Sequence, residues 1–238
     1  MPGATVARWD RHQILQHLVL VVCFTTLVVT GTPLRVPQAS LSRAVMRVLG
    51  GADQAALLHR AAAVGLILLG VYHGLYLFWR WRRYGRVSAM WPRVRDFRDL
   101  LQVLRYFFGL SPDKARFDRD NYAEKFEYWA LVWGSAVMIL TGLILWFPTV
   151  ATRVLPAVVL ELAKVIHGYE AVLAALAILI WHFYHVHLNP AAFPMSKTWL
   201  TGRISRKEME EEHPLELERL ARKAPAEPEP AEETPTPT

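Results

Sequence analysis

The amino-acid sequence predicts an all-α membrane protein, a bundle of four transmembrane helices with both termini on the cytoplasmic side. The 238 residues are 53% hydrophobic, and this hydrophobicity falls in long runs rather than in the short periodic runs of a soluble domain. Arg-rich stretches separate the runs. Several of the nine tryptophans lie near the ends of the runs, as aromatic side chains do at membrane interfaces.

Each of the four apolar runs has a length near the roughly 20 residues that cross a bilayer as a helix. The first run ends at Gly31 and Pro33, which are ordinary helix stops. The expected helices extend over about Gln13 to Thr30, Gln54 to Trp79, Phe126 to Phe147 and Val158 to Val186.

The distribution of positive charge predicts the topology. Residues 80–120 hold eleven Arg or Lys against five Asp, whereas residues 32–53 hold three Arg. Cytoplasmic loops carry the excess of Arg and Lys, so the termini and the long middle loop are expected in the cytoplasm and the chain in the inner (cytoplasmic) membrane as a multi-pass protein. The net charge of +6 is explained by these flanking residues, and no nucleic-acid partner is expected.

Apolar residues recur at helical spacing over residues 96–110 of the middle loop, opposite Arg98 and Arg105. This pattern predicts a cytoplasmic amphipathic helix on the membrane surface, and a helix packed on a partner subunit remains an alternative. Residues 1–207 are expected to form the transmembrane domain. From residue 208 the chain becomes acidic and then Pro-rich, which predicts a largely disordered tail over 208–238.

Histidines at two depths are the candidate functional residues. His167 and His182 lie fifteen residues apart on the fourth run, about 22 Å along a regular helix and about 60° apart around it. His59 matches His167 in depth, and either His17 or His73 matches His182. Imidazole ligates haem iron, so the spacing predicts two b-type haems. The single cysteine, Cys23, excludes an intrachain disulfide, and it also excludes haem attachment through Cys-x-x-Cys-His.

Residues of about 8–215 resemble the di-haem cytochrome b subunits of formate dehydrogenases, nickel–iron hydrogenases and thiosulfate reductase-like complexes. The resemblance rests on motifs in all four runs: His17 followed by Val21-Val22-Cys23-Phe24 and Thr30-Gly31, Leu58-His59, Asn121 with Thr141-Gly142, Ile166-His167 and Trp181-His182. It implies a bundle like that of cytochrome b561 and formate dehydrogenase gamma subunits. Its implied haem ligands are His17, His59, His167 and His182, with His73 the alternative to His17. In formate dehydrogenase members the last two ligands are fourteen residues apart, whereas here they are fifteen apart.

The resemblance further implies that quinone exchanges electrons near the cytoplasmic-side haem, with Asn121, Lys125 and Tyr184 lining its site. Asn is also a common helix N-cap. Arg11 and Arg60 are candidate partners of haem propionates, and surface positions facing headgroups fit them equally.

The expected function is that of an electron-transfer subunit rather than a complete enzyme. It connects a periplasmic redox subunit, either an iron–sulfur protein or a multihaem c-type cytochrome, with the quinone pool. A solitary cytochrome b561-like reductase and a haem-free membrane anchor are the alternatives.

Overall fold

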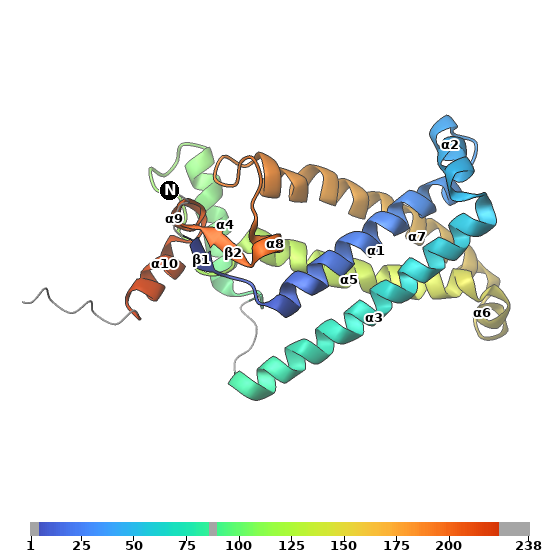
Figure 1. The fold of residues 1–238 in the computed structure, drawn as a ribbon, viewed down its shortest axis with the longest axis horizontal. Helices are drawn as coiled ribbons and strands as arrows, with labels where there is room; N and C mark the ends of the chain where they lie inside the picture. The colour runs from blue at the N-terminus through green and yellow to red at the C-terminus, as the bar shows by residue number, and fades with distance from the viewer. Residues whose placement is uncertain (1–4, 86–89, 224–238) are drawn as a thin grey trace, which may run out of the picture.

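A computed structural model describes residues 5–85 and 90–223. Four long helices run side by side along the molecule (Figure 1), and each is long and apolar enough to cross a membrane. They are α1 (Arg11–Arg35), α3 (Ala52–Tyr84), α5 (Tyr122–Trp146) and the helix that begins as α7 (Ala157–Leu176) and extends to Leu188. The prediction of four long apolar helices is therefore confirmed, and each helix lies close to its predicted range.

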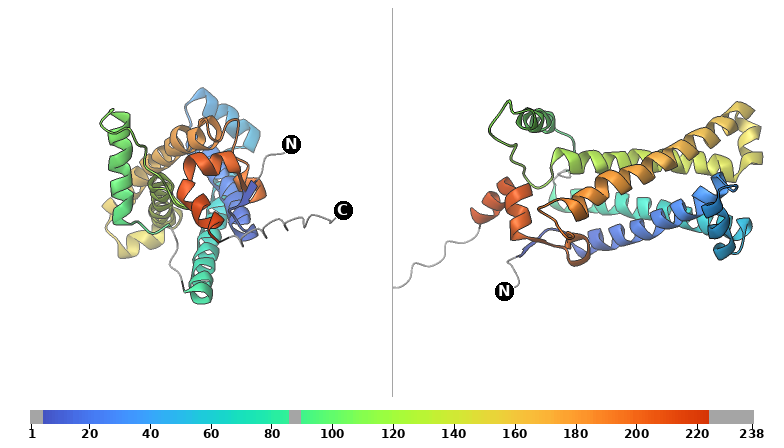
Figure 2. Two further views of the ribbon diagram at one scale, coloured as in Figure 1. Left: turned by 90° about the vertical axis from the view of Figure 1, so that its left-hand side faces the viewer. Right: turned by 90° about the horizontal axis from the view of Figure 1, so that it is seen from above.

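The four helices form two pairs. Helix α1 packs mainly on α3, and α5 packs mainly on α7, whereas contacts between the pairs are few. The view from above in Figure 2 shows the two pairs as two layers. Within the first pair a Cβ atom at Gly65 would lie 2.9 Å from Cys23 Sγ, so this glycine allows the close approach of α1 and α3. Four histidines, described below, face one another between the two helix pairs.

Two short helices close one end of the bundle, which we call the α2–α6 end. They are α2 (Ser40–Leu49) and α6 (Pro148–Val154), and they lie in the connections between the long helices. Helix α2 ends at Gly50, which has a φ of 88°, a conformation that favours glycine. Helix α6 begins with Pro148 at its first turn, a position where the missing N–H of proline is harmless.

The opposite end, which we call the terminus end, holds both ends of the described chain and the long middle loop (Figure 1). A small antiparallel sheet pairs a strand before α1 with a strand after the fourth long helix, with Val6 opposite Ile204. The prediction of an all-α protein did not include this sheet. The elements at this end are β1 (Thr5–Ala7), α4 (Val94–Phe107), α8 (Thr198–Thr201), β2 (Arg203–Ser205), α9 (Arg206–Glu212) and α10 (Pro214–Ala221).

The prediction of disorder from residue 208 is wrong for residues 208–221. This segment forms α9 and α10, in which Met209 is only 1% exposed and Glu216 only 4% exposed. Composition suggested disorder because acidic and proline residues dominate the tail, but Glu216 has a buried basic partner, Arg8, from a distant part of the chain. Residues 224–238 of the predicted tail lie outside the described residues.

The fourth long helix is not a regular α-helix throughout. After Leu176 it continues as two π-helical segments, η1 (Ala177–His182) and η2 (Tyr184–Leu188). A π turn holds more residues than an α turn, so it absorbs an extra residue. The assumption of a regular α-helix from His167 to His182 is therefore wrong, and the π segment explains how an interval of fifteen residues serves in place of fourteen.

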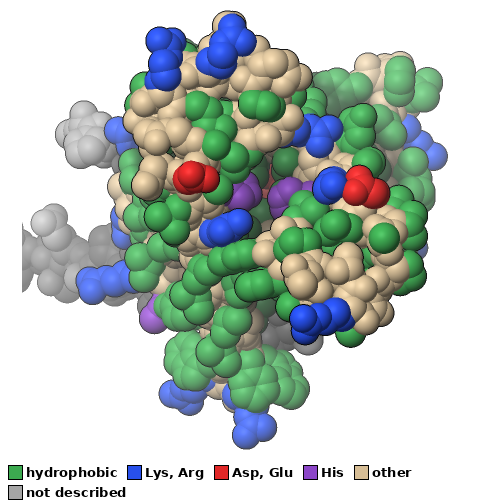
Figure 3. All heavy atoms as spheres, turned by 90° about the vertical axis from the view of Figure 1, so that its right-hand side faces the viewer, with side chains coloured by type: hydrophobic (Ala, Val, Ile, Leu, Met, Phe, Trp, Pro, Cys, Tyr) green, Lys and Arg blue, Asp and Glu red, His purple; other side chains and the backbone are tan. Residues whose placement is uncertain are grey.

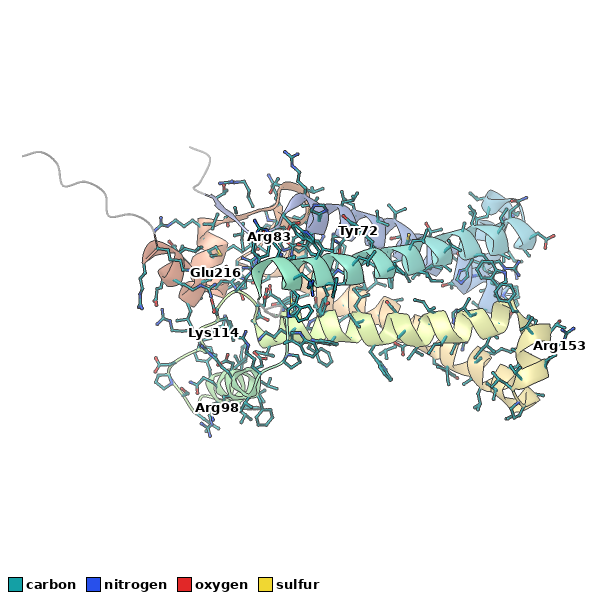
Figure 4. The ribbon with its side chains drawn as sticks, turned by 90° about the horizontal axis from the view of Figure 1, so that it is seen from below. Tyr72, Arg83, Arg98, Lys114, Arg153 and Glu216 are labelled. Carbon is teal, nitrogen blue, oxygen red and sulfur yellow. The ribbon has the colours of Figure 1, made fainter. Side chains whose placement is uncertain are left out.

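Positive side chains gather at the terminus end. Figure 4 shows Arg83, Arg98 and Lys114 at that end of the bundle and Arg153 at the other.

The predicted amphipathic helix corresponds to α4, and its Phe97 and Phe107 side chains are largely exposed. The placement of α4 against a membrane and the cytoplasmic position of the termini remain predictions.

Candidate functional site

Two histidines face one another between the helix pairs near the α2–α6 end. His59 comes from α3 and His167 from α7, and their ring centroids lie 6.4 Å apart. Both side chains are half-buried in the described structure. We call them the α2-end pair. A view onto this end shows histidine side chains at the bottom of a hollow between two lobes of the molecule (Figure 3).

A second facing pair lies nearer the terminus end. His17 comes from α1 and His182 from η1, and their ring centroids also lie 6.4 Å apart. We call them the terminus-end pair. Trp9 and Trp199 flank His17, with centroid distances of 5.4 and 5.8 Å. The segment that follows the fourth helix therefore returns to cover this pair.

The spacing of both pairs suits two ligands on opposite faces of one metal ion. An imidazole nitrogen binds a transition metal at about 2 Å, and the nitrogen lies about 1 Å from the centre of its own ring. Two imidazoles on opposite sides of one ion therefore have ring centres roughly 6 Å apart, which is close to the 6.4 Å of both pairs. The two histidines of each pair are therefore spaced so that both could hold one haem iron.

Each histidine of the α2-end pair has a threonine hydroxyl beside Nδ1. The distances are 3.0 Å from Thr30 Oγ1 to His59 Nδ1 and 2.9 Å from Thr141 Oγ1 to His167 Nδ1. Each hydroxyl also donates its hydrogen to the carbonyl four residues earlier in its helix. A hydroxyl has one hydrogen, so it accepts from Nδ1–H, and the lone pair of each imidazole is then on Nε2. This is the tautomer that ligates a metal through Nε2.

Both threonines are followed by glycines that let the imidazoles approach. A Cβ atom at Gly31 would lie 3.0 Å from Cε1 of His59, and one at Gly142 would lie 3.3 Å from Cε1 of His167. A larger residue at either position would push the ring away. The same Thr-Gly dipeptide therefore supports one histidine in each helix pair.

The terminus-end pair is supported differently. His182 Nδ1 lies 3.2 Å from Glu127 Oε2 on α5. His17 Nδ1 is buried and lacks a hydrogen-bond partner within the described part of the chain. A buried polar atom without a partner is costly, so Nδ1 of His17 has room for an additional hydrogen-bond partner.

His73, the alternative to His17, has other partners. Its Nδ1 lies 2.6 Å from Gln16 Oε1, and its Nε2 lies 2.9 Å from the Tyr128 hydroxyl. Both ring nitrogens are thus engaged by protein groups from α1 and α5. The structure brings His17, and not His73, within ring contact of His182.

The side chains of the three predicted quinone-site residues have partners other than one another or are exposed, although the backbone N–H of Lys125 donates to the Asn121 carbonyl at 3.1 Å within α5. Asn121 caps α5, with Oδ1 accepting from the Glu124 backbone N–H at 2.9 Å. Lys125 is 6% exposed and forms a 2.6 Å ion pair with Asp96 of α4. Tyr184 lies on η2 with its side chain 48% exposed. Asn121 and Lys125 both have structural partners, so their predicted ligand role stays a prediction.

A buried charged cluster lies at the terminus end beside the start of α5. Arg8 donates to Glu216 at 2.8 Å and to Glu124 at 3.3 Å. His213 Nδ1 donates to the Asp118 carbonyl at 2.9 Å. Burial lowers the pKa of His213, and the Arg8 charge lowers it further. The cluster fastens α9 and α10 to the first residues of the chain and to α5.

Two arginines lie close to the α2-end pair. The Arg35 guanidinium occupies the space that a side chain at Gly168 would fill, directly after His167, and stacks over Tyr169 at 5.0 Å. Arg60 follows His59 and stacks over Trp146 at 5.6 Å.

Arg35 was not anticipated, because only the fold brings the end of α1 beside α7. Arg11, the predicted cation at the other end, is exposed.

Comparison with known proteins identifies the chain. A family model described as prokaryotic cytochrome b561 matches residues 8–192. The formate dehydrogenase cytochrome b556(fdo) subunit of Escherichia coli strain K12 is 19% identical over 204 residues, which cover 85% of this chain and 89% of the relative. The same subunit from E. coli O6:H1 and from E. coli O157:H7 gives the same values.

The fold, the facing imidazoles and these similarities define a multi-pass membrane cytochrome b that takes part in electron transfer. The chain belongs to the prokaryotic cytochrome b561 family. The resemblance noted in the sequence is thereby confirmed, and family membership implies a b-type haem.

Proposed function

We propose that this chain is a di-haem cytochrome b subunit that carries electrons across the inner membrane between a redox partner and the quinone pool. His59 and His167 would hold one haem, and His17 and His182 the other. The observation that carries the proposal is the centroid distance of 6.4 Å in both pairs. Each b-type haem, when bound, supplies a carrier for one electron.

The residues of the chain contribute orientation, tautomer control and charge. Thr30 and Thr141 keep the α2-end imidazoles in the tautomer that offers Nε2. Arg35 and Arg60 supply cationic groups for haem propionates beside His167 and His59. The pairs lie about 20 Å apart along the fourth helix, given a rise of about 1.5 Å per residue. With two haems at this separation, an electron would cross the bilayer in shorter steps than with a single haem.

The distribution of Arg and Lys residues supports an assignment of the two ends of the bundle to the two sides of the membrane. The terminus end carries most of the Arg and Lys residues, which favours the cytoplasmic side. The α2–α6 end then faces the periplasm, where a redox subunit with an iron–sulfur cluster or c-type haems would dock. The curated relatives are cytochrome subunits of formate dehydrogenase, which supports membership of such a complex.

Quinone is proposed to exchange electrons at the terminus end. Asn121, Lys125 and Tyr184 remain the candidate residues there. The side-chain oxygen of Asn121 caps α5. The NH₂ group of the same side chain is therefore the part that could donate a hydrogen bond to a quinone carbonyl. Lys125 would act through its ion pair with Asp96, by fixing α4 against α5 beside the site.

The proposal is tested by reducing the haems with quinol. Purified oxidised protein in detergent is mixed with an excess of short-chain quinol, and haem absorbance is followed. We expect both haems of the wild-type protein to be reduced. His182→Ala, which lacks the terminus-end haem, should leave its remaining haem oxidised. The matched variant His167→Ala should keep a haem that quinol reduces. The opposite pattern would place quinone at the α2–α6 end and contradict the proposal.

A further inference from the structure

Glu127 is the one acidic side chain that contacts a proposed haem ligand in the described residues. Its Oε2 lies 3.2 Å from His182 Nδ1. The two histidines of the α2-end pair have neutral hydroxyl groups in the corresponding place. The two proposed haem sites therefore differ in the charge of the group behind their ligands.

Within residues 5–85 and 90–223, no Lys or Arg side chain forms an ion pair with the Glu127 carboxylate. Among the ion pairs of the described ranges, its only partner is His182. The two basic side chains that form ion pairs at the start of α5 have other partners, since Lys125 pairs with Asp96 and Arg8 pairs with Glu124 and Glu216. The Glu127 side chain is 30% exposed and lies in the second turn of an apolar helix. A carboxylate in a membrane-spanning segment is expensive and usually has a function.

An ionised carboxylate is only an acceptor, so His182 Nδ1 must donate to it and His182 Nε2 carries the lone pair. A carboxylate behind a metal-bound histidine fixes its ring and raises its basicity. A more basic ligand and a nearby negative charge both stabilise ferric iron more than ferrous iron. A threonine oxygen fixes the tautomer in the same way but brings no charge.

We infer that Glu127 is a positioning residue that lowers the reduction potential of the terminus-end haem through His182. The threonine hydroxyls leave the potential of the α2-end haem without such a shift. This inference rests on the proposed function, because it requires a haem at each pair. It assigns the difference between the two haems to side chains of α5, with Glu127 near one end and Thr141 near the other.

The test is a redox titration of the purified protein, followed by haem absorbance, for wild type and Glu127→Gln. Glutamine keeps an acceptor but removes the charge. We expect the ferric-to-ferrous ratio of one haem to fall about tenfold at a given applied potential, which is about 59 mV upward for one electron. Glu170→Gln, a matched change in a spanning helix away from His182, should leave that midpoint unchanged. Thr141→Val, which acts on His167 of the other pair, should also leave that midpoint unchanged.

An unchanged pair of midpoints in a Glu127→Gln protein that retains two haems would overturn the inference and leave the proposed function intact. If Glu127→Gln loses a haem, Glu127→Asp must restore both the haem and the wild-type midpoint. An aspartate variant that binds the haem at a raised midpoint would also overturn the inference. A wild-type protein without haem would instead contradict the proposed function.

Discussion

At the scale of single residues, the candidate site depends on what stands behind each imidazole. His59 and His167 have hydroxyl partners, His182 has a carboxylate, and His17 has indole rings beside it. A metal-bound histidine is oriented by the partner of its other nitrogen. The support of the four rings would therefore decide how firmly each proposed haem is held, and it can be tested one side chain at a time.

Thr141→Val should weaken the α2-end haem site. Valine has nearly the same shape but cannot accept from His167 Nδ1, and loss of such a partner typically lowers metal affinity about 10–100-fold. The measurement is the rate at which haem is lost to an excess of apomyoglobin. Thr152→Val is the matched control, because Thr152 also bonds the carbonyl four residues earlier but contacts no histidine. Equal rates in the two variants would show that the hydroxyl is unimportant.

The pairs of histidines that match in predicted depth are also the pairs whose rings face one another in the structure, because depth along a helix is a property of the local sequence. Sequence reasoning could not choose between His17 and His73, since the choice depends on how α1 and α3 are rotated about their axes. Glu127 was missed because the third helix was expected to begin at Phe126, which made the carboxylate seem to be at the edge of the membrane. The Asp96 partner of Lys125 lies 29 residues away, and no local pattern indicates such a contact.

At the scale of elements, the fourth helix shows how an irregular turn preserves a functional position. An extra residue in a regular α-helix would rotate all later residues by about 100°. The π segments from Ala177 take up this residue and leave His182 facing His17. Hydrophobic periodicity does not reveal a π turn, so the sequence predicts a regular helix here.

Deleting Leu179 should therefore be tolerated. The π turn would become an α turn, and His182 would remain directed at His17, so we expect both haems to be retained. Deleting Val22 from the regular helix α1, between His17 and Thr30, is the matched control and should lose haem because it turns these two residues apart by about 100°. Haem per protein after purification is the measurement. Loss of haem from the Leu179 deletion alone would contradict the role assigned to the π turn.

The docking of α9 and α10 should weaken in mild acid. Burial and Arg8 lower the pKa of His213 in the docked state, whereas the undocked histidine has an ordinary pKa of about 6.5. The undocked state therefore binds more protons as pH falls below about 6.5, and the stability of docking decreases in that direction. Hydrogen exchange over residues 206–221 at pH 7.5 and 5.5 measures this change.

His213→Gln should remove this dependence on pH while keeping a donor for the Asp118 carbonyl. The raised pKa of Asp120, caused by burial and by Glu124, favours docking in acid and acts in the opposite direction. The difference between wild type and variant therefore isolates the histidine. If the two proteins respond equally to pH, His213 is not the responsible group.

At the scale of the whole molecule, composition and charge predicted the four spanning helices and their ranges because the bilayer imposes length and polarity on each segment. Features at the two ends were not predicted. The sheet between β1 and β2 and the docking of α9 and α10 depend on contacts between residues about 200 positions apart, such as Arg8 with Glu216. The resulting molecule is two helix pairs with facing histidines between them, covered at the terminus end by β1, β2, α8, α9 and α10.

The most direct test of this account is the ratio of b-type haem to purified protein, measured from the visible spectrum. We predict two haems for the wild-type chain, two for His73→Ala, and one for His17→Ala. A colourless wild-type protein, a single haem in the wild type, or two haems in His17→Ala would contradict the claim that His17–His182 and His59–His167 each hold one haem.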